Sequence, residues 1–511
     1  MNDKLTAALI DTVSIQEYIF SSNKLRENIG ASYIVENIYN IPLKEALEKL
    51  FGKQNVDIHK WEREPCNIVI EKEEADFEIG YIGGGNTLIF FKEADKAREF
   101  IKIYTKHLLA TAPGLRTAFG LIEDFDLLSF QDSMLKLHKE LQHNKNRYFP
   151  NVDINKYGFT LDCPRTNKSA ELGRKDAESK FISAAVDAKV KASRHAKKYL
   201  EEKFFKKDVP YTFTYEITQL GQHLNLRNYI AVVHVDGNRM GEKFSKCGSL
   251  QEIRTLSKSV KSATENAFTK MVEKVVDKIE DQTISCQNDF HLRQEGGKTV
   301  LPLVPVVAAG DDVTFICEGR LGLWLAEVFI KEFSSKKVLG EYLSACGGVS
   351  IVKTKYPFYR AYNLAEGLTN RAKKESRKHN NSSFIDFFIS SSGWNGEIDD
   401  IFQKHFTALE GNLHFGPYRI DAGGEKSVAN LKNIIKGFYR FPKNKLMQLR
   451  AALFESKEAG SAVVEELRAK NLSLPKAGNY YENVDLWNNQ TTPYFDAIEL
   501  IDFYPEGLLC I

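Results

Sequence analysis

Two adjacent carboxylates, Asp311 and Asp312, stand between two apolar runs in the segment LPLVPVVAAGDDVTFICE, residues 301–318. The two β-prone runs, separated by Gly310, predict a β-hairpin with the acids at its tip. Neighbouring carboxylates repel each other, and a divalent cation removes that repulsion, because Mg²⁺ prefers one or two carboxylates together with substrate phosphates. An ordinary polar turn is the alternative interpretation, since aspartate and glycine are common turn residues.

A third carboxylate, Asp236, ends a strand-like run in the segment NYIAVVHVDGNRMGEKF, residues 228–244. Gly237 follows it and lets the backbone approach a bound ion, so we include it in the predicted metal site. If Asp236, Asp311 and Asp312 meet at adjacent strand ends, they can hold two metal ions. Two such ions clamp the attacking and leaving oxygens of a phosphoryl transfer. The three aspartates are therefore the predicted catalytic and metal-binding residues.

Several residues around these acids are of the types that contact a nucleotide. Gly310 lies in the predicted turn, and the backbone N–H groups of Asn238 and Arg239 can meet phosphate at the start of a helix. Lys373 and Lys374 close a later predicted helix and can neutralise a triphosphate. Lysines at the end of a helix also interact favourably with its dipole, and this alternative stays open.

The same order of elements occurs twice along the chain, which indicates an internal repeat. Asp11 and Asn86 lie 75 residues apart, and so do Asp236 and Asp311. We therefore expect two copies of one β-α-β-hairpin-α-β unit, in which Asn86 and Thr87 replace Asp311 and Asp312. An amide is a poor Mg²⁺ ligand, so the first copy is predicted to be inactive. Its glycine turn can still hold phosphate through backbone N–H groups, which makes nucleotide-binding candidates of Gly83, Gly84, Gly85 and Asn86.

The composition is that of a globular protein with several domains. The chain has 511 residues, a net charge of +2 and 43% hydrophobic residues, which predicts three or four domains and excludes a polybasic nucleic-acid binder. Seven scattered cysteines without a CxxC pair indicate neither a disulfide framework nor a zinc ribbon. No apolar run has membrane-spanning length and no signal peptide begins the chain, so we expect a cytoplasmic protein without membrane contact.

Four segments follow from this pattern, and together they predict an α+β fold. They are a first domain at 1–150, a mainly helical linking insert at 151–222, a second domain at 223–392 and a helical C-terminal domain at 393–511. Basic residues in the insert predict either an RNA or phosphate contact or a solvated helix face, of which we favour the second. The basic C-terminal helix fits an RNA or protein partner and a solubilising surface equally well. Cys163 and His195 are too few to make a zinc site.

The motifs together resemble the palm domains of class III nucleotide cyclases, GGDEF cyclases and many polymerases. In detail they are similar to the large polymerase/cyclase subunit of type III CRISPR effector complexes, the Csm/Cmr large-subunit type. The residues that carry this resemblance are IAVVHVDGNRMG (230–241), AAGDD (308–312) and GVSIVKTKYPFYRAYNLAEGLTNRAKK (348–374). DTVSIQEYIFSSNKLRENIGAS (11–32), YIGGGNTLIFF (81–91) and YFDAIELIDF (494–503) agree as well, so the resemblance covers most of the chain.

The resemblance implies two ferredoxin-like, GGDEF-type palm domains in tandem that bind two ATP molecules between them. It also implies that the second palm joins ATP through 3′–5′ links into a cyclic oligoadenylate, with release of pyrophosphate, as a signal in antiviral defence. Two Mg²⁺ or Mn²⁺ ions would sit on Asp236, Asp311 and Asp312, and the segment from Gly83 to Asn86 would hold the second nucleotide. Guide-RNA effector subunits and target RNA are the implied partners, and a homodimer is possible.

Three departures from the family pattern shape these expectations. Ala309 replaces the first glycine of the family's hairpin motif, but both acids remain. The chain has no His-Asp dipeptide, so we expect no HD nuclease domain and no cleavage of single-stranded DNA. The family's zinc-binding insert is reduced to DCPRTNKSA (162–170). A small CRISPR effector and a stand-alone defence relative both fit these features.

Three functional hypotheses remain after this reading. The first is a metal-dependent nucleotidyltransferase that makes a cyclic oligoadenylate or a related cyclic oligonucleotide. The second is a non-catalytic scaffold of an RNA-guided complex, which the inactive first copy and the basic helices favour. The third is a cyclase that makes a cyclic mononucleotide, and it ranks last because the first copy lacks an identifiable base-reading pair.

Overall fold

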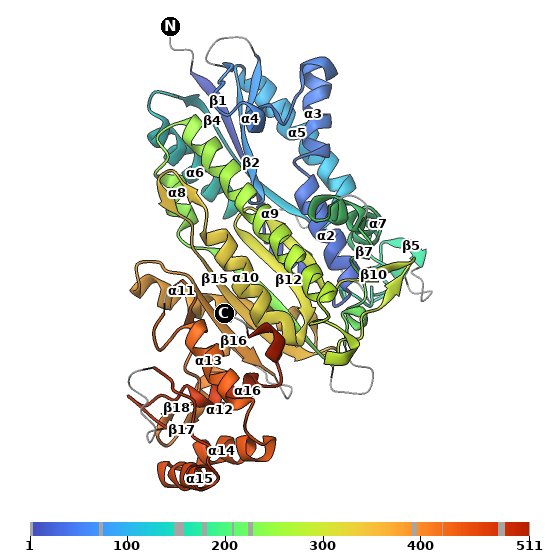
Figure 1. The fold of residues 1–511 in the computed structure, drawn as a ribbon. Coiled ribbons are helices and arrows are strands. Elements are labelled where there is room, and N and C mark those ends of the chain that lie inside the picture. Colours follow the sequence, from blue (N-terminus) through green and yellow to red (C-terminus); the bar gives the residue numbers. More distant parts are fainter. Residues whose placement is uncertain are drawn as a thin grey trace.

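Two sheets with the same strand order form the centre of the protein (Figure 1). The computed structural model describes residues 4–70, 75–147, 158–175, 181–206, 209–222, 228–390, 396–421, 423–478 and 486–509. The first sheet has the order β2-β3-β1-β4, and the second begins with the equivalent order β11-β12-β8-β15 before it continues to β16 and β19. The predicted α+β class and the internal repeat are confirmed.

The first palm is an antiparallel sheet with helices after its first, third and fourth strands. Its strands are β1 (Leu5–Val13), β2 (Phe77–Gly83), β3 (Asn86–Phe91) and β4 (Arg116–Phe125). Its helices are α1 (Ile15–Phe20), α2 (Leu25–Asn37), α3 (Ile41–Phe51), α4 (Lys60–Arg63), α5 (Ala94–Thr111) and α6 (Phe130–Lys145). The near-continuous apolar run of β1 is buried, as expected for a strand covered on both faces.

Gly30 lies in the interior of helix α2, where glycine generally weakens a helix. The helix runs through Gly30 without a break, because this glycine lies where α7 (Ala184–Phe204) packs on α2. A Cβ atom at position 30 would lie 2.0 Å from the carbonyl oxygen of Lys189. Glycine is therefore present for close packing of two helices and does not end the helix.

The linking insert packs its long helix on the first palm. It contains β5 (Leu172–Lys175), β6 (Phe181–Ile182), α7 and β7 (Tyr211–Thr212). Lys189 is buried and donates to Ser21 Oγ at 2.7 Å, while Lys197 and Lys203 form ion pairs with Glu295 and Glu36. These three lysines contact the protein itself, so they belong neither to an RNA-binding surface nor to the solvated helix face that the sequence analysis favoured.

The second palm repeats the first and adds β16 and β19 beyond β15, at one edge of its sheet. The strands of its sheet in this region are β8 (Tyr229–Gly237), β11 (Leu303–Ala309), β12 (Asp312–Glu318), β15 (Ala345–Lys353) and β16 (Phe384–Ile389). Two short antiparallel pairs lie outside that sheet: β9 (Gln294–Glu295) pairs with β10 (Lys298–Val300), and β13 (Lys337–Val338) pairs with β14 (Glu341–Tyr342). Its helices are α8 (Met240–Ser245), α9 (Leu250–Glu280), α10 (Gly322–Ser334) and α11 (Phe358–Lys378).

The long helix α9 joins the two palms and runs along the middle of the molecule (Figure 1). Arg254 on this helix is fully buried and reaches into the first palm. Its guanidinium donates to Glu78 Oε1 at 2.7 Å and to the carbonyl oxygens of Ile79 at 2.6 Å and Gly80 at 3.0 Å. A buried charge needs such a complete set of partners, so this contact fixes one palm against the other.

The C-terminal region is mainly helical, as predicted, but one of its strands joins the second palm. It contains α12 (Ile398–His405), β17 (Thr407–Ala408), β18 (Gly411–Asn412), β19 (Tyr418–Arg419), α13 (Val428–Phe438), α14 (Lys443–Glu455), α15 (Lys457–Ala469) and α16 (Tyr494–Leu500). β19 lies beyond the predicted boundary at residue 392 and pairs with β16. Four basic side chains of the predicted basic helix form ion pairs with acids of the chain itself, namely Lys432, Lys443, Lys445 and Arg450. Lys432 is buried, so it belongs neither to a partner surface nor to a solubilising one.

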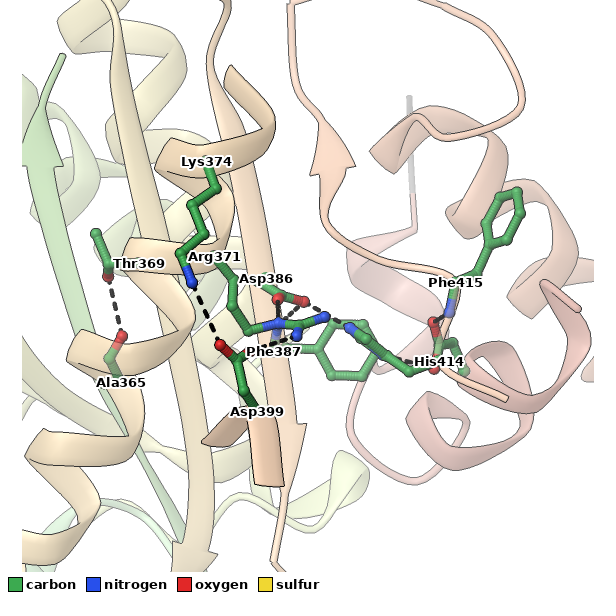
Figure 2. A network of polar contacts seen from close by, with 10 residues as sticks. Ala365, Thr369, Arg371, Lys374, Asp386, Phe387, Asp399, His414 and Phe415 are labelled. Atoms are coloured by element: carbon green, nitrogen blue, oxygen red, sulfur yellow. Dashed lines mark hydrogen bonds and ion pairs between the residues drawn. The ribbon is translucent and has the colours of Figure 1, made fainter. Parts of the chain in front are cut away.

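A buried polar network connects this region to α11 of the second palm (Figure 2). His414 lies between two carboxylates, with Nε2 2.7 Å from Asp386 Oδ1 and Nδ1 3.0 Å from Asp496 Oδ1. Arg371 of α11 donates to Asp386 at 3.0 Å and to Asp399 at 2.7 Å. The two carboxylates raise the pKa of His414 to about 9, so the imidazole carries a positive charge that balances them.

Candidate active site

Asp312 and Asp236 lie directly opposite each other on neighbouring strands. β12 and β8 pair in antiparallel register, and Asp312 is the partner of Asp236 in that register. Side chains of directly opposed residues point to the same face of a sheet and lie close together. Two like charges in this position destabilise the fold unless another group neutralises them.

Asp311 occupies the tip of the hairpin next to these two acids. Ala309 pairs with Asp312, so Gly310 and Asp311 form a two-residue turn in which Gly310 has the left-handed φ of 64°. A Cβ atom at Gly237 would lie 2.9 Å from the Cβ of Asp311. The structure therefore gives Gly237 the role of leaving room for Asp311, beside the metal-site role predicted from the sequence.

The charges of this cluster are poorly compensated. Burial and the nearby charge of Asp236 raise the pKa values of Asp311 and Asp312 to about 7. Burial also lowers the pKa of His234 to about 4, so this imidazole is neutral, and its Nδ1 lies 3.1 Å from Thr314 Oγ1. The buried Oδ1 atom of Asp312 has no hydrogen-bond partner.

These observations bear on whether a divalent cation fits here. Hard carboxylate oxygens with raised pKa values and an unpartnered buried oxygen are the donor set of a Mg²⁺ or Mn²⁺ site. Within the described ranges, however, no three carboxylate, imidazole or thiol side chains are arranged to hold an ion together. Asp311 and Asp312 fit a cation by their chemistry, whereas Asp236 has another partner.

That partner is Lys373 of α11, whose ammonium group donates to Asp236 Oδ2. Lys374 points elsewhere and lies 3.3 Å from Asp399 at the start of α12 (Figure 2). The structure thus separates two lysines that the sequence analysis considered together. The helix also continues to Lys378, so neither lysine lies at its end as predicted.

Asn238 and Arg239 do not present free groups to a phosphate. The backbone N–H of Asn238 donates to the Ser344 carbonyl oxygen at 2.8 Å, and its buried side chain donates to Ser344 Oγ at 3.1 Å. Arg239 is exposed and forms an ion pair with Glu242. Asn238 holds the turn after β8 in place, which corrects the prediction that its N–H group meets a ligand.

The tips of the two glycine hairpins meet between the palms. A Cβ atom at Gly310 would lie 3.1 Å from the Cα of Gly84. A cavity of about 900 Å³ opens beside this contact. The predicted nucleotide-binding residues Gly83, Gly84, Gly85, Asn86 and Gly310 line it together with Asp311. The structure thus brings the two hairpins to one cavity, although they are more than 200 residues apart in the sequence.

The strand register corrects the alignment of the two copies. Asn86 pairs with Asp11 across β3 and β1, just as Asp312 pairs with Asp236 across β12 and β8. Asn86 is therefore the counterpart of Asp312, and Gly85 is the counterpart of Asp311. The equal spacing of 75 residues had instead matched Asn86 with Asp311, which is one residue away. Lys145 of α6 forms an ion pair with Asp11, as Lys373 does with Asp236.

One residue of the site was missed in the sequence. Gln16 of α1, in the first palm, donates from Nε2 to Asp312 Oδ2 in the second palm at 3.1 Å. Nothing in the segment SIQEY singles out a glutamine. Gln16 lies five residues after Asp11, and Gly241 lies five residues after Asp236, so the two positions are equivalent in the repeat. This equivalence was the only signal in the sequence that could have pointed to Gln16.

A comparison with protein families decides what kind of domain this is. Residues 229–382 match the model of the Cas10/Cmr2 second palm domain, and this range includes β8, the acidic hairpin and α11. This part of the chain is therefore similar to the second palm domain of Cas10/Cmr2 proteins. A comparison with curated proteins gives no match.

Solved structures support the Cas10-like fold over nearly the whole chain. A Csm1–Csm4 cassette in complex with pppApApA has a TM-score of 0.55 and 13% identity, and the match covers 98% of this chain and 69% of that one. A cassette with one ATP has a TM-score of 0.54 and 15% identity over 98% and 70% of the two chains. Csm1 of T. onnurineus has a TM-score of 0.51 and 14% identity over 99% and 69%. At these identities the likeness concerns the fold.

Among the helices of the described ranges, none has both the length and the apolar character that crossing a membrane requires.

Proposed function

We propose that the protein is a metal-dependent nucleotidyltransferase that joins ATP into a cyclic oligoadenylate. The observation that carries this proposal is the placement of Asp236, Asp311 and Asp312 together at adjacent strand ends, with Asp311 in the wall of the cavity between the two palm hairpins. The similar Csm1–Csm4 structures contain AMPPNP, ATP, pppApApA and cA4, which supports nucleotides as the ligands of this cavity. The predicted domain limits at residues 150, 222 and 392 remain part of this proposal.

In the proposed reaction the 3′-hydroxyl oxygen of one nucleotide attacks the α-phosphorus of another. A phosphodiester bond forms, the bond from the α-phosphorus to the pyrophosphate oxygen breaks, and the hydroxyl proton leaves to solvent. The glycine turns from Gly83 to Asn86 and at Gly310 let phosphate approach the backbone. Bound Mg²⁺ or Mn²⁺ would neutralise charge on the triphosphate, and Asp311 and Asp312 would hold it. Lys373 keeps a positive charge beside Asp236.

Other subunits belong to the proposed setting of this activity. The similar Csm1 chains form a cassette with Csm4, so we propose that this chain also binds effector subunits carrying guide RNA and target RNA. A non-catalytic scaffold is the second candidate. It is favoured by the two protein donors, Lys373 and Gln16, that already occupy oxygens of Asp236 and Asp312.

Mass spectrometry of the products tests the proposal. The full chain is incubated with ATP and Mg²⁺ or Mn²⁺, with and without RNA, alongside the variants Asp311→Asn and Asp312→Asn. We expect a cyclic oligoadenylate from the native chain and at least a roughly 100-fold loss in both variants. Asp11→Asn is the matched control, because Asp11 holds the place of Asp236 in the first palm, and it should keep most of the activity. Product from Asp312→Asn at the native rate, or no product in any condition, contradicts the proposal.

A further inference from the structure

Two short helices hold equivalent places at the ends of β1 and β8. Both have six residues, and the residue before each has a left-handed backbone, with φ of 55° at Ser14 and 54° at Arg239. The strand register makes Asp11 the counterpart of Asp236. Ser14 and Arg239 each lie three residues after these aspartates, so the two helices align without a gap. It follows that Gln16 of α1 corresponds to Gly241 of α8, and that Phe20 corresponds to Ser245.

The helices α6 and α11 are equivalent in the same way. A Cβ atom at Gly120 would meet the Leu137 carbonyl oxygen at 2.8 Å, and one at Gly348 would meet that of Ala365 at 2.1 Å. Lys145 and Lys373, which hold the two equivalent aspartates, lie eight residues after these carbonyl groups. Met134 of α6 is therefore the counterpart of Tyr362 of α11.

On one side of the paired hairpins these positions border open space. Met134, Gly241 and Ser245 all line the cavity of about 900 Å³, together with the glycine turn of the first palm. Gly241 and Ser245 place little or no side chain there. The buried Oδ1 atom of Asn86, which also belongs to the cavity wall, has no hydrogen-bond partner.

On the other side the counterpart positions carry large side chains that contact one another. Gln16 donates to Asp312, and the Phe20 ring stacks on Tyr362 with 4.0 Å between the ring centroids. Phe20 and Tyr362 are buried, with 1% and 2% of their surfaces exposed. The space that is open beside the first hairpin is therefore filled at the equivalent place beside the acidic hairpin.

We infer that the protein in this conformation offers a single pocket for a nucleoside triphosphate, beside the first hairpin, and that α1 plugs its counterpart beside Asp236 and Asp312. The inference rests on the proposed function, because it takes a nucleotide as the ligand. The glycine turn of the first hairpin suits the phosphates, because backbone N–H groups in such a turn can hold them.

The plug has a consequence for the proposed reaction. Condensation needs two nucleotides side by side, and the second can reach the acids only after α1 withdraws Gln16 and Phe20. The contact between α1 and α11 therefore restrains synthesis until the palms shift relative to each other. Restraint of this kind keeps a second messenger from forming without a signal.

Binding stoichiometry tests the inference without any turnover. Isothermal titration calorimetry of the full chain with AMPPNP and Mg²⁺ should give one site per chain. The triple variant Gln16→Gly with Phe20→Ser and Tyr362→Met gives the plugged side the residues of the open side, and we expect two sites. Gly241→Gln gives the open side one residue of the plugged side, and we expect affinity to fall at least about tenfold. Thermal unfolding of each variant checks the fold, and Gln16→Gly with Phe20→Ser replaces the triple variant if that one unfolds.

Each result separates the inference from the proposed function. Two sites in the native chain, or one site in a folded variant without the plug, overturns the inference and leaves the synthase activity possible. One site in the native chain and two in the variant, without product from either, supports the inference and contradicts the synthase. No binding by the native chain overturns both.

Discussion

Gly84 and Gly310 touch where the two palm hairpins meet, so close that a Cβ atom at Gly310 would lie 3.1 Å from the Gly84 Cα. The contact joins the glycine hairpin of the first palm to the acidic hairpin of the second. It places the acidic turn at the wall of the cavity beside the first hairpin. Gly310 meets two demands at once, because it also has a left-handed φ of 64°.

Substitution of Gly310 should therefore cost more than strain alone. Gly296 is the matched control, since its φ of 59° is similar but no atom lies within 4 Å of an added Cβ. We expect Gly296→Ala to lower stability by about 1 kcal/mol through the left-handed backbone. Gly310→Ala should lower it further, because the hairpins must also separate, and should weaken nucleotide binding. Thermal unfolding and calorimetric titration measure both effects, and equal losses in the two variants contradict the expectation.

The adjacent lysines of α11 should differ sharply in their effect on product formation. Lys373 contacts Asp236, whereas Lys374 is exposed and contacts Asp399. Lys373→Ala removes the positive charge beside the acids, and we expect product formation from ATP to fall at least about tenfold. Lys374→Ala should stay within about twofold of the native rate, because an exposed ion pair contributes little. Equal loss in both variants would contradict this expectation. It would mean that the total positive charge of α11 matters, and not which lysine contacts Asp236.

The buried guanidinium of Arg254 should be costly to remove alone. Arg254→Leu leaves the carboxylate of Glu78 buried without its cation, and we expect a loss of about 3–5 kcal/mol. Adding Glu78→Gln should recover part of this loss, because the amide keeps an oxygen for the backbone N–H of Ile70, which donates to Glu78 at 2.8 Å. Thermal unfolding of the two variants measures the recovery. A double variant less stable than Arg254→Leu would contradict this explanation.

The network around His414 should make stability depend on pH. Its pKa is raised from the ordinary 6.5 to about 9 by Asp496 and Asp386 against the opposing effect of burial. The contribution is therefore fully present below about pH 6.5 and is lost as pH rises through about 9. The difference between these pKa values corresponds to at most about 3 kcal/mol.

The variant His414→Gln tests this dependence. We expect it to lower the unfolding temperature at pH 6 much more than at pH 9.5, because only the charged imidazole balances the two carboxylates. His195→Gln, at an exposed position on α7, is the control and should have little effect at either pH. An equal loss for His414→Gln at both pH values would show that the packing of the ring on Phe402, and not its charge, matters.

Much of the fold follows from local sequence. Apolar runs such as IAVVHV and TAALI predict buried strands, and Gly84, Gly85 and Gly310 have the left-handed backbone of tight turns. The order of these elements occurs twice, so the repeat and the α+β class were predictable. The three aspartates were found because adjacent acids at a turn have few structural reasons to exist.

Side-chain direction did not follow from the same information. Lys373 and Lys374 are neighbours in sequence, but a rotation of about 100° per residue sends one to Asp236 and the other to Asp399. Asn238 has the chemistry of a ligand contact, but the carbonyl group that occupies its N–H belongs to Ser344, which is distant in sequence. Spacing placed Asn86 opposite Asp311, and only the strand register showed that its counterpart is Asp312.

The sequence by itself determined the strands, the hairpins, the repeat and the acids, because each depends on residues close together along the chain. Tertiary structure alone decided which palm contributes what to the site. Gln16 reaches Asp312 across 296 positions, and Gly84 meets Gly310 across an interface between two domains. Such contacts depend on how two folded units dock, and docking is set by the shape of whole surfaces, which no local pattern of residues records.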